Sequence, residues 1–279
     1  MTTDTMLLKR FTGLHRLFHL GLVILFMLLS VTGLAWMYYE TTWGKGIADL
    51  FGGFPNTIYV HRIVGLLMLA GFAAQILYMI TRFNWRRPIR SFVGRDTLVF
   101  HWGDIKDFFG QCGWILGLSK APKFDRWSWW QKFDYWAVWW GLVIVGVTGL
   151  LVYDPVLSSD YVPGWFYNIA FWIHRIEAVL AMGHIFTVHF FVEHFRPNHF
   201  PYSNTMFDGG ISLKHAREEH PAWVERLEND GMLEEMMMPV PPLGIRIMHV
   251  FFGYSMIALG IFLLVAALVN VAALTFVAW

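Results

Sequence analysis

Residues 167–194, YNIAFWIHRIEAVLAMGHIFTVHFFVEH, decide the fold of this chain. The stretch is long and apolar enough to cross the roughly 30 Å hydrocarbon core of a membrane as one helix. It nevertheless carries His174, His184, His189 and His194. Ionisable side chains inside a membrane helix are costly, and they mark functional sites. We therefore take this helix as the element around which the rest of the chain is organised.

The composition indicates an integral membrane protein. Of the 279 residues, 56% are hydrophobic, 18% are aromatic and only 15% are charged, whereas soluble domains are about 25% charged. The single cysteine, Cys112, excludes a disulfide framework, an iron–sulfur cluster held by this chain and C-x-x-C-H attachment of haem. The net charge of +1 comes without a long basic tail, and we expect no nucleic-acid partner.

Five apolar stretches predict an all-α protein, an integral membrane helical bundle that forms one membrane domain over residues 1–279. The expected transmembrane helices cover residues 17–39, 59–82, 133–153, 167–194 and 247–277. Two long connections, 83–132 and 195–246, separate them. The second contains SLKHAREEHPAWVERLEND, which we expect to form an amphipathic surface helix. We find no internal repeat.

The distribution of basic residues predicts the orientation in the membrane. Lysines and arginines gather before the first helix and in residues 83–132, whereas the connections 40–58 and 153–166 hold only Lys45. Because loops rich in lysine and arginine stay on the cytoplasmic side, we expect the N-terminus and both long connections inside and the C-terminus outside. The expected location is the bacterial cytoplasmic (inner) membrane, with lipid as a partner.

This topology sorts the histidines by depth. His61 and His174 fall near the outer surface, and His19 and His189 near the inner one. The fifteen residues from His174 to His189 span roughly 22 Å and leave the two side chains about 60° apart around a regular helix. Two pairs of imidazoles on facing helices are what two b-type haems need as axial ligands. Three neighbouring arginines are suited to the haem propionates: Arg16, Arg62 and Arg175.

The remaining histidines leave alternatives open. His15 lies one turn before His19 and could be the ligand in its place. For His184, between the two depths, we favour packing or proton handling, and we expect His194 at the inner interface. His249 has no obvious partner and could contact a quinone. The histidines of the connections are expected to be solvated: His101, His199, His215 and His220.

Several segments resemble the cytochrome b (gamma) subunit family of respiratory formate dehydrogenases, which extends to the cytochrome b subunits of membrane-bound hydrogenases and thiosulfate reductases. The similar segments are HRLFHLGLVILFMLLSVTG, IYVHRIVGLL, RWSWWQKFDYWAVWWGLVIVGVTGLL and FWIHRIEAVLAMGHIFTVHFFVEHF. This chain looks like a five-helix variant, because the fifth helix and the long 83–132 connection are additions to the family pattern. The resemblance also implies a spacing between the two histidines of the fourth helix that is one residue shorter than here.

The resemblance implies a four-helix core with two haem b groups, one held by His61 and His174 and the other by His19 and His189. It further implies a quinone, menaquinone or ubiquinone, beside the inner haem. In the family this site includes the segment that enters the third helix, here RWSWWQK. Gln131 is retained in it, whereas Ser128 stands in place of an asparagine.

The predicted function is electron transfer across the membrane. The outer-face (periplasmic) partner would be an iron–sulfur or multihaem cytochrome c subunit, and the inner partner the quinone. The sequence shows no catalytic acid–base pair or nucleophile, so we expect the substrate chemistry on a partner chain. Two alternatives are a stand-alone transmembrane b-type reductase and a haem-free membrane anchor or proton-handling subunit.

Overall fold

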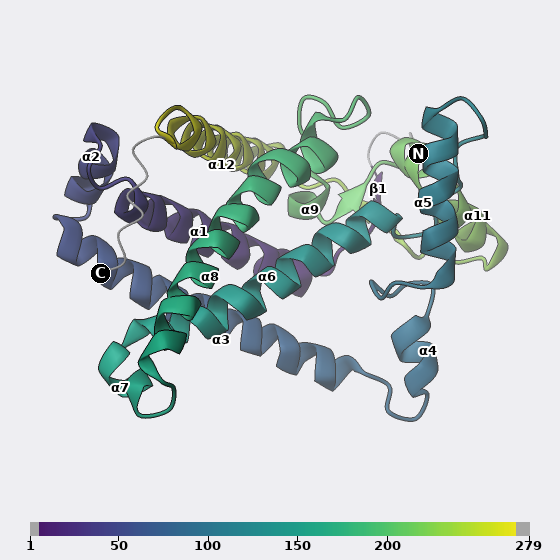
Figure 1. The fold of residues 1–279 in the computed structure, drawn as a ribbon. Helices are drawn as coiled ribbons and strands as arrows, with labels where there is room; N and C mark the ends of the chain where they lie inside the picture. Colours follow the sequence, from purple (N-terminus) through teal and green to yellow (C-terminus); the bar gives the residue numbers. More distant parts are fainter. Residues whose placement is uncertain (1–5, 272–279) are drawn as a thin grey trace. The chain divides into compact units, whose positions relative to one another are not determined.

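Five long helices dominate the computed structural model, which describes residues 6–271 (Figure 1). Each is long and apolar enough to cross a membrane. They are α1 (Gly13–Met37), α3 (Phe54–Arg82), α6 (Trp129–Tyr153), α8 (Gly164–Gly183) with its π-helical continuation, and α12 (Leu243–Val269). The predicted all-α membrane bundle of five helices is confirmed.

The helix bounds differ from the predicted ones mainly at the starts. Helix α3 begins at Phe54 rather than residue 59, and Pro55 lies in its first turn, where a missing N–H removes no hydrogen bond. Helix α6 begins at Trp129 rather than residue 133. The expected end of the fifth helix at residue 277 lies outside the described residues.

The chain divides into two compact units. One contains residues 17–76, 138–202 and 250–279 and holds most of the length of the five long helices. The other contains residues 1–16, 77–137 and 203–249, and it holds the short elements and both long connections. We refer to them below as the helical unit and the connecting unit.

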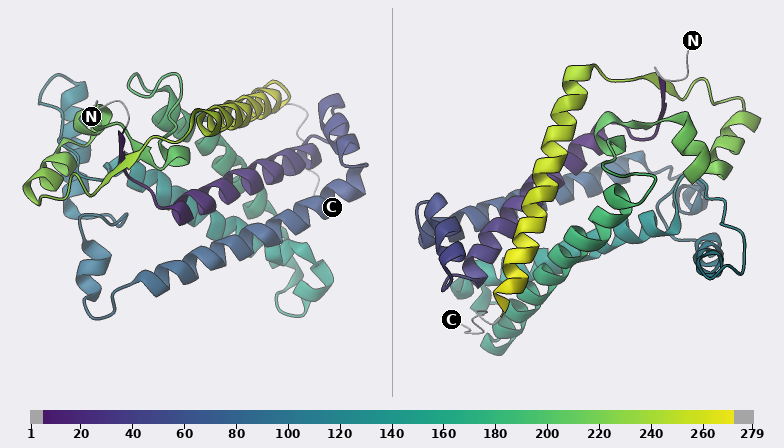
Figure 2. Two further views of the ribbon diagram at one scale, coloured as in Figure 1. Left: turned by 180° about the vertical axis from the view of Figure 1, so that it is seen from behind. Right: turned by 90° about the horizontal axis from the view of Figure 1, so that it is seen from above.

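In the helical unit, α12 packs against the C-terminal part of the α8 region. Buried side chains of α1, α8 with its continuation, and α12 form one apolar cluster, which includes Met27, Phe186 and Ile257. A Cβ at Gly260 would lie 2.8 Å from ring atoms of both Phe186 and Phe190. The fifth helix therefore packs directly on the segment that carries His189, and the right-hand view of Figure 2 shows it running beside α1.

The short elements of the helical unit lie between its long helices. Helix α2 (Thr42–Leu50) precedes α3, and α7 (Pro155–Ser159) precedes α8. Each begins with a side-chain cap. The Thr41 hydroxyl accepts a hydrogen bond from the Gly44 N–H, and the Asp154 carboxylate accepts from the N–H groups of Val156 and Leu157. Such caps satisfy N–H groups that the first helical turn leaves without partners.

The connecting unit contains a small antiparallel sheet that we did not predict. Strand β1 (Met6–Lys9) lies between β2 (Gly210–Ile211) and β3 (Met237–Pro239), with Leu8 opposite both Ile211 and Met237. Leu8 is fully buried with Trp223 and Leu227. The strands are too short for an alternating pattern to show in the sequence.

The predicted surface helix of this unit is two helices, α10 (Leu213–Glu219) and α11 (Pro221–Asn229). The break falls at His220, because a residue before proline avoids the helical conformation. The expectation that His220 is solvated was wrong. Its side chain is 1% exposed, and its Nδ1 lies 2.7 Å from the carbonyl oxygen of Asp125. His101 is also engaged, because its side chain caps α5 (Trp102–Ile115).

A buried ion pair ties α5 to the start of α6. The Nζ of Lys132 lies 2.9 Å from an oxygen of Asp104, and both side chains are at most 3% exposed. Asp104 also accepts a hydrogen bond from the N–H of His101, which completes the cap of α5. The remaining short helices of this unit are α4 (Pro88–Val93) and α9 (Thr205–Asp208).

Candidate functional site: paired histidines in the helical unit

His61 of α3 and His174 of α8 face each other. Their ring centroids lie 6.4 Å apart, with the ring planes at 82°. Two imidazoles that bind opposite sides of one metal through bonds of about 2 Å have ring centres roughly 6 Å apart. The separation of His61 and His174 therefore fits two axial ligands of one metal, and this is the pair predicted for the outer surface.

The neighbouring helices fix which ring nitrogen of each histidine carries the proton. Thr32 Oγ1 lies 2.8 Å from His61 Nδ1, and the Thr32 hydroxyl donates to the Leu28 carbonyl at 2.7 Å. Because that hydroxyl proton is engaged, the Thr32 oxygen accepts a hydrogen bond from the Nδ1–H of His61. His61 Nε2 is then unprotonated and available to a metal, as required of a ligating histidine.

His174 has a matching environment on α6. Its Nδ1 lies 3.0 Å from the Val145 carbonyl oxygen and 3.3 Å from Thr148 Oγ1. A carbonyl oxygen can only accept, so Nδ1 of His174 carries the proton and Nε2 does not. Both candidate ligands thus present the same nitrogen.

A glycine follows each threonine and leaves room for the imidazole. A Cβ at Gly33 would lie 3.3 Å from Cε1 of His61, and a Cβ at Gly149 would lie 3.2 Å from Cε1 of His174. These contacts are tighter than most Cβ contacts in proteins. A side chain at either glycine would push the histidine beside it by a few tenths of an ångström.

The threonines and Gly149 were missed at the sequence level, although a signal was present. Residues 31–34 and 147–150 have the same sequence, Val-Thr-Gly-Leu. The expectation of no internal repeat missed this tetrapeptide, which is far shorter than a structural unit. The two copies lie on α1 and α6 and support the two histidines of one pair.

The second cluster of histidines lies at the π-helical continuation of α8. The His189 and His194 rings are 6.3 Å apart at 88°, and His194 stacks on Tyr202 with centroids 4.7 Å apart and planes at 7°. His19 of α1 lies within electrostatic reach of His194. The predicted inner ligands His19 and His189 thus belong to a cluster with a third imidazole, His194, whose buried Nδ1 makes no hydrogen bond within residues 6–271.

The helix changes its geometry at this cluster. After α8 ends at Gly183, residues His184–His189 form π-helix η2 and residues Phe191–Phe195 form π-helix η3. A π-helix closes its hydrogen bonds at i→i+5 and so takes up an extra residue within a turn. The π segment therefore turns the chain less per residue than a regular α-helix does, which changes the direction in which His189 projects relative to His174.

The three arginines predicted to bind propionates lie in different surroundings. Arg62 is exposed, with its guanidinium 5.4 Å from the Tyr153 ring. The Arg175 guanidinium lies 5.4 Å from the Trp172 ring. The Nε of Arg16 is buried and has no hydrogen-bond partner in the described part of the chain. A buried donor of this kind is expected where an anionic group such as a propionate binds.

Ser128 and Gln131 hold the start of α6 in the connecting unit. The Gln131 side-chain oxygen accepts hydrogen bonds from Arg10 Nη2 at 2.8 Å and from the Ser128 N–H at 3.3 Å. The Ser128 side chain is fully buried, and its hydroxyl has no partner among residues 6–271. The predicted quinone contacts of both residues stay predictions.

His249 has a partner that the sequence did not reveal. Its Nδ1 lies 2.8 Å from Oδ1 of Asp208, and its ring lies beside Phe207. Both side chains are largely buried. The expectation that His249 lacks a partner was wrong. The sequence did not reveal Asp208 as the partner, because the two residues are 41 positions apart along the chain.

Comparison with known proteins agrees with this arrangement. The model of the prokaryotic cytochrome b561 family matches residues 10–198, more than half of the chain. The chain therefore belongs to the prokaryotic cytochrome b561 family. It is a multi-pass membrane cytochrome of the b type, which carries haem b and acts in electron transfer.

Individual relatives point the same way. The cytochrome b556(fdo) subunit of formate dehydrogenase from Escherichia coli K12 is 23% identical over 215 residues, covering 77% of this chain and 90% of the relative. The protein of the same name in Escherichia coli O157:H7 gives the same figures. The family match ends at residue 198, so α12 lies beyond it.

Proposed function

We propose that this protein holds two haem b groups and transfers electrons across the membrane between an outer-face redox partner and a quinone near the inner face. His61 and His174 bind one haem, and His19 and His189 bind the other. The observation that carries the proposal is the geometry of His61 and His174, at 6.4 Å with both Nδ1 atoms engaged. The second site follows from the histidines that gather about 22 Å further along α8.

The protein's own residues position and tune the two sites. Thr32 and Thr148 hold the His61 and His174 rings in the orientation and protonation state of metal ligands. Arg62 and Arg175 supply cations at the outer pair, and Arg16 supplies one near His19 for anionic propionates. When bound, haem b supplies reversible one-electron chemistry at its iron.

The chain works with other subunits. Its relative is named as a subunit of formate dehydrogenase, and we place the substrate chemistry on a partner chain. We infer an iron–sulfur or multihaem cytochrome c partner on the outer face, and a menaquinone or ubiquinone as the inner partner, with Ser128 and Gln131 as its candidate contacts. The N-terminus and both long connections are placed inside, because they carry most of the basic residues.

The direct test is a haem count on the purified protein. We expect a reduced-minus-oxidised spectrum with a b-type α-band and two haems per chain by pyridine haemochrome assay. One haem per chain would refute the second site. Absence of the α-band in folded protein would instead support the haem-free alternative. Purification of a fully active quinone-independent enzyme without any other subunit would favour the stand-alone reductase.

The inner ligand can be assigned by comparing two variants. We expect His189→Ala to lose one of two haems, because it removes an axial ligand, whereas His194→Ala retains both. The haem-to-protein ratio measures the result, with the low-spin ferric signal as a check on ligation. Loss of haem in His194→Ala and retention in His189→Ala would reassign the ligand to His194.

Replacing Thr32 with valine tests the proposed tuning of the outer site. The hydrogen bond from His61 Nδ1–H makes the imidazole a stronger donor and favours the oxidised iron. We expect Thr32→Val to raise the midpoint potential of one haem by about 20–40 mV, the equivalent of a neutral hydrogen bond. Thr32→Ser retains the hydroxyl and should leave the potential near the wild-type value. A redox titration in which both variants shift equally would contradict this role.

A further inference from the structure

The arginine-rich segment after α3 is not used by the proposed electron transfer. Helix α3 ends at Arg82 and α4 begins at Pro88, so α4 must lie close to the membrane surface. Large apolar side chains in α4 and just before it are exposed: Ile89 is 80% exposed and Phe92 56% in α4, and Trp85, three residues before its start, is 70% exposed. Exposed tryptophan and aliphatic side chains at this level are typical of segments that lie in the membrane interface.

The far end of the same connection is also held at the membrane boundary. Trp136 Nε1 of α6 donates to the Leu98 carbonyl at 2.9 Å, and the Lys132 Nζ lies 3.4 Å from the Val99 carbonyl oxygen. Residues 98–99 therefore run along the first two turns of a membrane-spanning helix. The segment from Arg82 to Val99 begins and ends at the same membrane surface.

Helix α5 continues this surface with an exposed apolar stripe. Trp102, Ile105, Phe109 and Leu116 follow at intervals of three, four and seven residues, which places them on one helical face. Each is exposed. The buried pair of Lys132 and Asp104 fixes the opposite side of this helix against α6.

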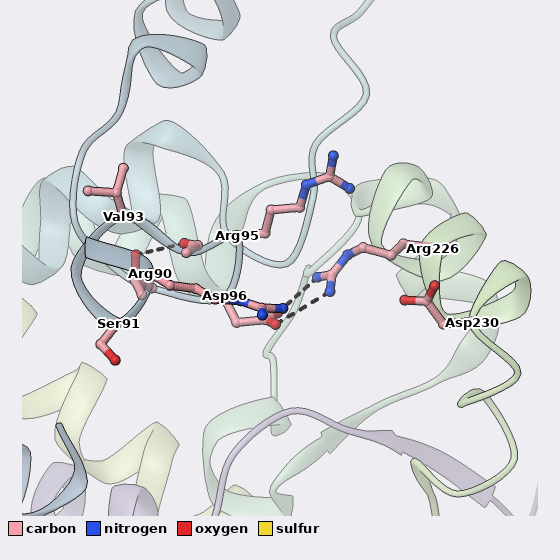
Figure 3. A pocket seen from close by; sticks show the side chains of 9 residues that line it. Arg90, Ser91, Val93, Arg95, Asp96, Arg226 and Asp230 are labelled. Atoms are coloured by element: carbon pink, nitrogen blue, oxygen red, sulfur yellow. Dashed lines mark hydrogen bonds and ion pairs between the residues drawn. The ribbon is translucent and has the colours of Figure 1, made fainter. Parts of the chain in front are cut away.

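The charges between these apolar faces are mainly positive. Arg86, Arg87, Arg90 and Arg95 are exposed. Arg90 and Arg95 line a cavity of about 580 Å³ whose other charged residues are Arg226, Asp96 and Asp230 (Figure 3). Within residues 6–271, neither Arg90 nor Arg95 forms an ion pair. Three arginines therefore face two carboxylates in this cavity, and Arg90 and Arg95 are the cations that no carboxylate pairs with directly.

Asp96 does not neutralise Arg90 or Arg95, because its carboxylate forms ion pairs with Arg226 and Arg126 instead. Arg226 Nη2 lies 2.9 Å from Asp96 and 2.8 Å from Asp125. Burial alone would raise the pKa of Asp96, but the hydrogen bonds and charge of Arg226, with the charge of Arg126, lower it. Figure 3 shows the Arg95 guanidinium pointing away from the Asp96–Arg226 pair.

We propose that Arg90 and Arg95 bind the headgroup of an anionic phospholipid, with Ile89, Phe92 and the neighbouring Trp85 inserted among its acyl chains. Phosphate and glycerol oxygens match the arginine donors, and the exposed apolar side chains lie where the headgroup meets the hydrocarbon. The site would hold the 83–132 connection to the membrane surface. It does not depend on haem or quinone.

The test is a lipid titration of the purified full-length protein in a zwitterionic detergent. Phosphatidylglycerol should raise the thermal midpoint in a saturable way, whereas phosphatidylcholine with the same acyl chains and inorganic phosphate should not. Each arginine near an anionic surface contributes about fivefold in affinity, so Arg90→Gln/Arg95→Gln should weaken the apparent affinity for phosphatidylglycerol about 25-fold. Lys214→Gln, an exposed cation on α10, should behave as the wild type.

Ile89→Glu provides a second variant, because this exposed side chain can be changed without disturbing the fold. It should also weaken the response to phosphatidylglycerol while leaving the midpoint without lipid unchanged. Equal responses to both lipids, an equal response to inorganic phosphate, or a full response in the double-arginine variant would each overturn the proposal.

Discussion

Replacing His174 with alanine is expected to leave the protein with about half of its haem. His174 faces His61 at 6.4 Å, and its Nδ1 is fixed by the Val145 carbonyl and Thr148, so the substitution removes one of the two imidazoles of this pair. The inner cluster lies roughly 22 Å further along α8 and should keep its haem. The result is measured as haem per chain, with a redox titration that resolves one component instead of two.

The matched control is His184→Ala, which removes an imidazole from the same helix between the two sites. It should retain both haems. An unchanged haem content in His174→Ala, or equal losses in both variants, would contradict the assignment of His174. Loss of all haem would show that the two sites do not fill independently.

Replacing Lys132 with methionine is expected to be among the most destabilising changes in the connecting unit. It leaves the Asp104 carboxylate buried at 3% exposure without its cation. Removing one partner of a buried ion pair costs about 3–5 kcal/mol, which corresponds to an apparent thermal midpoint lower by roughly 6–20 °C. The measurement is thermal unfolding in detergent.

The double variant Lys132→Met/Asp104→Asn is the control for this prediction. It removes both charges, and the asparagine oxygen can still accept the hydrogen bond from the His101 N–H. Most of the lost stability should return, because replacing a whole buried pair by neutral groups is often close to neutral. A double variant as unstable as the single one would show that Lys132 acts through packing and not through its charge.

Hydropathy and the positions of the histidines were enough to predict much of this architecture. The five apolar stretches gave the spans, because a membrane helix must satisfy its backbone internally and stay apolar over its length. Sorting His61 and His174 to the same depth predicted a pair that the structure brings together. Both results depend on features that accumulate over a whole helix.

The contacts that single residues make could not be predicted in this way. The partners Asp208 and His249 are 41 residues apart, and Asp125 and His220 are 95 apart, so neither pair shows a local pattern. The π-helical turn at His184–His189 differs from an α-helix in its hydrogen bonds and in the extra residue that they enclose, and no residue type specifies either feature. Thr32 and Thr148 could have been found from the repeated Val-Thr-Gly-Leu segments.

The central claim is that this chain itself transfers electrons across the membrane, and proteoliposomes test it most directly. The purified protein is reconstituted with ferricyanide trapped inside, and an impermeant reductant is added outside. We predict reduction of the trapped ferricyanide by the wild type, and a rate in the His174→Ala variant that falls to that of protein-free vesicles. Equal rates for the wild type, the variant and empty vesicles would contradict the account.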